Sequence, residues 1–176
     1  MLFTGLSILT MVHGLAFGGG ALLTLAAALF ALRVLPATDG TPPSPEQARS
    51  LSLLLSAAAA LLWMAVLGGT YLVFPPYRVT PPEGLADLSA YPRSLLLGSP
   101  DTAWLHAFAM ESKEHVPWMA AMLATAVAFV GVRERRTFLS DRQVRGVVTA
   151  CVAIAFALTA YMALLGTFVN KAAPLQ

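Results

Sequence analysis

Ionisable side chains gather in one stretch, residues 104–118, which reads WLHAFAMESKEHVPW. This stretch runs directly into an apolar segment, residues 119–132. It holds two histidines, two carboxylates and a lysine, namely His106, His115, Glu111, Glu114 and Lys113. Ionisable groups at the entrance of an apolar helix are costly in a membrane, so they are the first candidates for function.

The composition places these residues in a membrane protein. The 176-residue chain is 57% hydrophobic and 11% charged, with a mean hydropathy of +0.71, whereas soluble domains carry roughly 25% charged residues. The net charge is only +2, and the basic residues lie in short loops, which excludes nucleic-acid binding. The single cysteine, Cys151, excludes an internal disulfide and a cysteine-based metal cluster. The length fits one domain, residues 1–176.

Four apolar segments are long enough to cross roughly 30 Å of hydrocarbon. They cover residues 3–32, 51–74, 103–132 and 146–168. The first lacks the features of a cleaved signal peptide, and we expect it to be retained. A linker rich in proline and glycine follows it, residues 36–45, in which Ser44 and Pro45 are typical of a helix start. The pair Pro75 and Pro76 is expected to end the second span.

The distribution of basic residues predicts the orientation. Seven arginines flank the loops between spans one and two and between spans three and four: Arg33, Arg49, Arg133, Arg135, Arg136, Arg142 and Arg145. The excess predicts that these loops are cytoplasmic and that the chain is N-out and C-out in the plasma (inner) membrane. The connection 75–102 is then external, and residues 89–97 are expected to form a short interfacial helix.

Two histidines are expected at the same depth. His13 precedes Arg33 by about 30 Å of helix, and His115 precedes Arg133 by about 27 Å. Facing each other, the two rings could bind the iron of a b-type haem between helices. Gly14 and Gly18 would either make room for the macrocycle or form a GxxxG helix contact. The haem propionates would pair with basic groups at the outer surface, for which the candidates are Arg78, Arg93 and Lys113.

Glu111 and His106 extend this candidate site. Glu111 lies four residues before His115, on the same helical face, where it could orient the imidazole or act as a proton relay. A site for another metal would need His13 as a third ligand. A salt-bridge cluster at the membrane edge is the alternative for Lys113 and its neighbours. His106 is a weaker candidate metal ligand, with a proton-exit group or a surface histidine as alternatives.

The sequence therefore predicts an all-α four-helix membrane bundle, with haem b and electron transfer as the first functional hypothesis. In helix count and paired histidines it resembles small b-type cytochrome membrane subunits. Such a subunit would exchange electrons with quinone, or with membrane or peripheral redox partners docked on the external connection. The alternatives are a cofactor-free assembly subunit and a small transporter of metal ions or protons.

Overall fold

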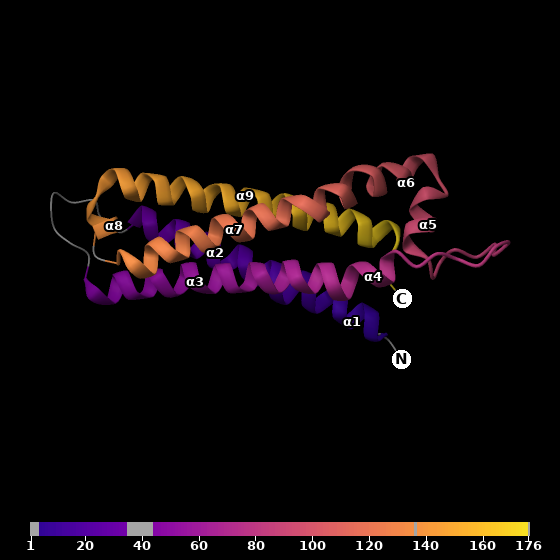
Figure 1. Cartoon of the computed structure of the whole chain (residues 1–176), viewed down its shortest axis with the longest axis horizontal. Coiled ribbons are helices and arrows are strands. Elements are labelled where there is room, and N and C mark those ends of the chain that lie inside the picture. The colour runs from indigo at the N-terminus through magenta and orange to yellow at the C-terminus, as the bar shows by residue number, and fades with distance from the viewer. Residues whose placement is uncertain (1–3, 35–43, 136, 176) are drawn as a thin grey trace.

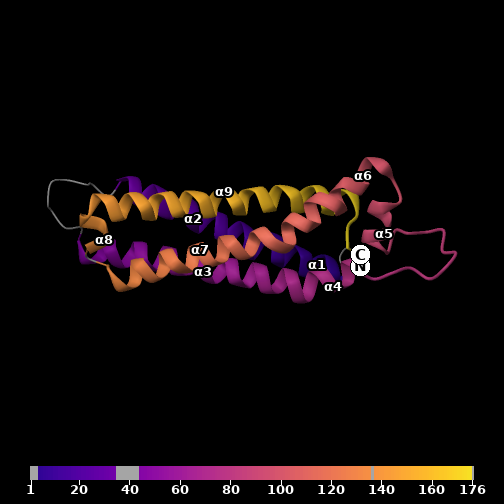
Figure 2. The same ribbon diagram turned by 45° about the horizontal axis from the view of Figure 1, so that its top comes forward.

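The chain forms an elongated bundle of helices. A computed structural model describes residues 4–34, 44–135 and 137–175, and these residues contain helices and no strand. Four continuous helical runs lie side by side along the long axis (Figures 1 and 2). They span Gly5–Val34, Pro45–Tyr77, Pro100–Arg133 and Arg142–Ala172. Each is long and apolar enough to cross a bilayer, so the prediction of a multi-pass helical membrane bundle is confirmed at this level.

Three of the runs change helix type along their length. The first is built from α1 (Gly5–Met11), the π-helix η1 (Val12–Gly19) and α2 (Gly20–Val34). The second is built from α3 (Pro45–Gly68), η2 (Gly69–Val73) and α4 (Phe74–Tyr77). The third is built from α6 (Pro100–Trp104), η3 (Leu105–Met110) and α7 (Glu111–Arg133). The fourth is the single helix α9 (Arg142–Ala172), and the short helices α5 (Pro92–Leu97) and α8 (Thr137–Ser140) lie in the connections.

Local sequence explains where the runs begin. The Ser44 side chain accepts from the Gln47 amide, with Pro45 at the first helical position, as predicted. Thr4 caps α1 in the same way. At α9, the Asp141 carboxylate accepts from two backbone amides at 2.8 and 3.1 Å. Each cap satisfies backbone N–H groups that have no partner inside the helix, which is worth about 1 kcal/mol.

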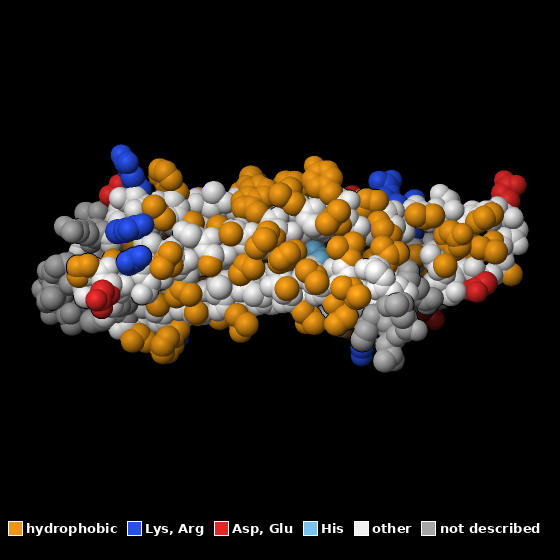
Figure 3. Space-filling model, turned by 90° about the horizontal axis from the view of Figure 1, so that it is seen from below, with side chains coloured by type: hydrophobic (Ala, Val, Ile, Leu, Met, Phe, Trp, Pro, Cys, Tyr) orange, Lys and Arg blue, Asp and Glu red, His pale blue; other side chains and the backbone are white. Residues whose placement is uncertain are grey.

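The two ends of the bundle differ. Both chain termini lie at the end that carries α4, α5 and α6, which we call the capped end, whereas α8 lies at the opposite end (Figure 1). Charged side chains gather towards both ends, and an apolar band lies between them (Figure 3). This distribution fits a bilayer around the middle of the bundle. The predicted linker at 36–43 and Arg136 lie outside the described residues.

Several predicted boundaries were wrong. Pro75 and Pro76 do not end the second run, because they occupy the first turn of α4, where a missing N–H costs little. The fourth run begins at Arg142 rather than at 146, since Asp141 caps it there. The short helix predicted at 89–97 is present but is limited to Pro92–Leu97.

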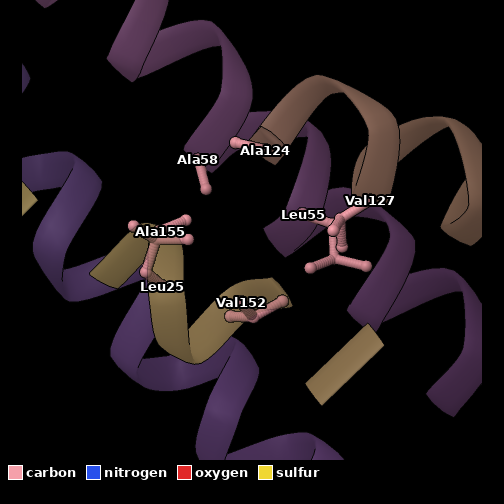
Figure 4. Close-up of a pocket in the computed structure, with 7 residues that line it drawn as sticks. All are labelled: Leu25, Leu55, Ala58, Ala124, Val127, Val152 and Ala155. Atoms are coloured by element: carbon pink, nitrogen blue, oxygen red, sulfur yellow. The ribbon is translucent and has the colours of Figure 1, made fainter. Parts of the chain in front are cut away.

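The apolar interior is divided into two clusters. The larger cluster joins α2, α3, α7 and α9 in the half of the bundle away from the capped end. The smaller one lies at the capped end and includes Tyr77, Leu96, Leu105 and Met162. In the larger cluster seven apolar side chains from all four runs surround a gap with no room for a water molecule (Figure 4). The polar side chains of His13 and Lys113 lie towards the capped end, and we call their level the polar layer; on the Lys113 side it overlaps the smaller cluster, whose members Met110 and Val116 flank this lysine in the sequence.

Candidate functional site

The polar layer lies in the part of the bundle that contains irregular helix. η1, η2 and η3 place π-helical turns in three of the four runs, all towards the capped end (Figure 1). Such turns shift the register of the side chains that follow and are frequent at functional sites. In α1, η1 and η2 no residue is buried. The first and second runs are therefore less tightly enclosed here than η3, in which Leu105, Ala109 and Met110 are buried.

His13 is held in this layer against a glycine. It lies in η1, and its ring packs on Gly69, the first residue of η2. A Cβ atom at position 69 would lie 2.8 Å from His13 Cε1 and 3.4 Å from Nε2. These distances are shorter than ordinary van der Waals contacts, so any larger residue would displace the ring. Gly69 thus allows the second run to approach the imidazole closely.

The two ring nitrogens of His13 have different surroundings. Nδ1 is buried without a hydrogen-bond partner. A neutral imidazole carries one N–H and one acceptor nitrogen. With the N–H on Nε2, Nδ1 has a lone pair that can accept a hydrogen bond from a ligand. A buried acceptor without a partner is uncommon and needs an explanation.

Lys113 brings a positive charge into the same layer from the third run. Its Nζ atom would lie 3.0 Å from a Cβ at Gly166 of α9, and its charge acts electrostatically on His13. Among the described residues Lys113 has no hydrogen-bond or ion-pair partner, and the nearby carboxylates, Glu111 and Glu114, are exposed. An ammonium group packed between helices without a counter-ion is costly and is therefore a candidate for function.

His115 does not share this layer with His13. It is exposed, and its Nδ1 donates to the backbone carbonyl of Glu111 at 2.9 Å. It lies nine residues, or two and a half turns, before the buried Ala124, which places it on the opposite face of α7. The predicted contact with Glu111 is present, but through the backbone and not through the carboxylate. The structure therefore does not bring the two proposed axial ligands together.

The surroundings of His13 and His115 do not fit one haem held between them. A bis-imidazole site needs both rings to face one interior space, whereas only His13 faces the layer. A Cβ at Gly14 meets no atom within 4 Å, and one at Gly18 meets only its own helix, so this GxxxG pair makes no close helix contact. Within the described residues, no three His, Cys, Asp or Glu side chains gather to hold a metal ion.

The remaining predicted residues lie nearer the capped end. His106, in η3, accepts or donates a hydrogen bond through Nδ1 to the hydroxyl of Tyr77 at 2.8 Å. Arg93, in α5, is half-buried, and its Nε has no partner. Arg78 is exposed and stacks over the Phe74 ring at 5.3 Å. Of the three basic groups predicted to pair with propionates, only Lys113 enters the polar layer.

The sequence analysis did not identify which face of the third run points into the bundle. Lys113 lies eleven residues, or about three turns, before the buried Ala124. This spacing to the small residues of α7 could have identified Lys113, rather than His115, as the inward-facing group. Tyr77 and Gly166 were not singled out as partners of His106 and Lys113, and no signal in the sequence pairs them.

No protein-family model, no curated protein and no solved structure matches this chain.

Proposed function

We propose that this chain is a membrane subunit that binds a quinol or quinone from the bilayer between His13 and Lys113. The observation that carries the proposal is the pairing of a buried imidazole nitrogen of His13 that has no hydrogen-bond partner with the ammonium of Lys113, whose Nζ lies against Gly166 and whose charge acts on His13. The absence of a carboxylate ion-paired to Lys113 within the described part of the chain favours a neutral or anionic ligand.

The ligand class follows from the hydrogen-bonding capacity of the two side chains. A quinol carries two oxygens on opposite sides of a ring. One hydroxyl can donate to Nδ1 of His13, and the other oxygen can accept from the ammonium of Lys113. A fatty-acid carboxylate would satisfy Lys113 alone. Oxidation of the quinol to the quinone releases two protons and two electrons. His13 would take the proton of the hydroxyl that it binds, the proton of the second hydroxyl would pass to water, and both electrons would pass to a redox centre on a partner subunit.

Access from the lipid supports a membrane-soluble ligand. None of the residues of η1 and η2 around the layer is buried, and a histidine side chain is visible within the apolar face of the bundle (Figure 3). A quinone diffusing in the bilayer could enter from the side of the bundle without crossing the capped end.

A released proton can leave the site only towards the capped end, because the larger apolar cluster blocks the path to the opposite end. The gap in this cluster admits no water (Figure 4), and a proton needs water or polar groups to move. By the excess of arginine at the opposite end, we place that end in the cytoplasm and the capped end outside the plasma membrane. Oxidation of the quinol would then release protons to the outer side.

Haem b on this chain stays a separate prediction, and a pyridine haemochrome assay tests it directly. Haem that is present in the purified chain and lost in both His13→Ala and His115→Ala would favour the cytochrome hypothesis over the one proposed here. A protein that binds neither haem nor quinone would correspond to the assembly subunit.

Tryptophan fluorescence provides the test of quinone binding. Trp63 and Trp118 pack edge to face with centroids 5.8 Å apart, and Trp118 lies five residues after Lys113 on α7. Quinones quench indole emission, so menaquinone-4 titrated into protein in nanodiscs should quench it saturably. Loss of one charge-assisted hydrogen bond costs about 1.5–3 kcal/mol, so Lys113→Met should weaken binding about tenfold to hundredfold.

Two controls make this experiment decisive. Lys171→Met removes an exposed lysine at the end of α9 and should leave the affinity unchanged. His13→Leu should weaken binding, since it removes the imidazole lone pair. Quenching that rises linearly with the quinone content of the bilayer, and equally in all variants, would show partitioning without a site and would refute the proposal.

A further inference from the structure

A second group of polar side chains lies at the capped end and is not used by the proposed quinone site. We infer that Arg93, Tyr77 and His106 form an oxyanion site that binds a phosphate group, either of an anionic lipid or of a soluble phosphate. The inference is independent of the proposed function, because neither His13 nor Lys113 takes part in it.

The Tyr77–His106 pair keeps one hydrogen available for a ligand. Tyr77 ends α4 and is 3% exposed, packed in the smaller apolar cluster. Its hydroxyl and Nδ1 of neutral His106 are 2.8 Å apart. Together the two side chains carry one O–H and one ring N–H, and their mutual hydrogen bond uses only one of them. The other remains free to donate to an acceptor.

Arg93 adds a charged donor on α5, a helix that packs in the same apolar cluster as Tyr77 through Leu95 and Leu96. Its positive charge acts on the Tyr77 hydroxyl, and its Nε is buried with no acceptor. The buried neighbours Pro92 and Leu96 anchor the short helix α5 that carries it. Buried N–H groups normally have a partner. A phosphate fits this requirement, since the planar guanidinium binds two of its oxygens at once.

The position of the site brings it close to phosphate groups. Tyr71 and Trp104 are 67% and 48% exposed near the same end, and such rings favour the headgroup layer of a bilayer. Arg78, exposed and stacked on Phe74, adds a second positive charge beside Tyr77. The headgroup layer is where the phosphates of lipids lie, and it is open to soluble anions.

One acidic group opposes the anion. Glu114 is exposed, and its charge also acts on Tyr77. Neutralising it should strengthen phosphate binding, because like charges repel. A purely structural role of the cluster would not predict this gain, so Glu114→Gln distinguishes a binding site from a packing contact.

Native mass spectrometry of the full chain provides the test. Protein is released from nanodiscs of phosphatidylcholine that contain 0–30% phosphatidylglycerol, and retained phosphatidylglycerol is counted. We expect one retained molecule per chain. Arg93→Gln and Tyr77→Phe should each reduce its affinity about tenfold, and Glu114→Gln should increase it. Arg49→Gln, an exposed arginine at the opposite end, is the matched control.

A second experiment distinguishes a lipid phosphate from a soluble phosphate as the ligand. Inorganic phosphate is added to protein in pure phosphatidylcholine nanodiscs, and the thermal midpoint of unfolding is measured. A rise that is lost in Arg93→Gln identifies a soluble phosphate as the ligand, whereas retention of phosphatidylglycerol without such a rise identifies the lipid. Equal behaviour of Arg93→Gln, Tyr77→Phe and Arg49→Gln in both arms would overturn the inference.

Discussion

Replacing Gly69 by alanine tests the contact on which the polar layer depends. The new methyl group would lie 2.8 Å from Cε1 of His13, whereas carbon atoms in contact are about 3.5–4.0 Å apart. The imidazole must therefore move. Overpacking of this kind costs about 1–3 kcal/mol. Alanine in a helix gains about 1 kcal/mol over glycine, so Gly69→Ala should range from neutral to destabilising by about 2 kcal/mol.

Gly68 is the matched control for this substitution. It is the preceding residue, and a Cβ there would meet no atom within 4 Å. Gly68→Ala should therefore be stabilised by the whole difference in helix propensity between alanine and glycine. The free energies of unfolding of the two variants should differ by about 1–3 kcal/mol. Unfolding by sodium dodecyl sulfate in mixed micelles, followed by circular dichroism, measures both free energies.

A double-mutant cycle assigns the difference to the ring. Once His13 is replaced by alanine, the methyl group at position 69 has no imidazole to displace, so Gly69→Ala should become stabilising in that background. The two substitutions should thus be non-additive by about 1–3 kcal/mol. Equal effects of Gly69→Ala and Gly68→Ala, or strictly additive effects with His13→Ala, would refute the packing of His13 on Gly69.

Two further predictions concern the bundle and the connection 78–91. Ser52→Ala removes a hydroxyl that donates to the Gly131 carbonyl of α7, and it should destabilise the bundle by about 1 kcal/mol. Ser56→Ala should cost less, because the Ser56 hydroxyl bonds only to its own helix. The same detergent titration measures the free energy of unfolding of both variants. The backbone N–H of Ser89 lowers the pKa of the Asp87 carboxyl, so the turn should be stabilised above the ordinary aspartate pKa and lose this contribution as the pH falls through the lowered value. Acidification slows the intrinsic, base-catalysed exchange of amides, so the loss of this hydrogen bond should appear as a fall in the protection factor of the Ser89 amide, and an unaltered protection factor would contradict this.

The helices and their caps were largely predictable, because they depend on local sequence. Apolar runs of sufficient length identified the four spans, and the Ser44–Pro45 start needed only the residues that follow it. The predicted end of the second run was wrong because the rule that proline ends a helix does not hold in the first turn. Two prolines were expected to stop a helix at 75–76, but they are tolerated in the first turn of α4.

The candidate site was only partly predictable. Counting residues from the arginines predicted the distance of His13 and of the stretch 104–118 from the arginine-rich end, since rise per residue is constant in a helix. It gave no information on which face of each helix turns inward. His115 was therefore preferred over Lys113, although Lys113 shares the face of the buried Ala124.

By itself, the sequence determined that this chain is a bundle of membrane-spanning helices with ionisable groups at one level. The physical reason is that hydrocarbon requires long apolar segments whose backbone groups are all satisfied internally. Only the tertiary structure decided the π-helical turns, the division of the core, and the contacts of His13 with Gly69 and of Lys113 with Gly166. The rotation of each helix about its axis is set by packing against its neighbours, because lipid is as apolar as the helix surface and favours no particular face.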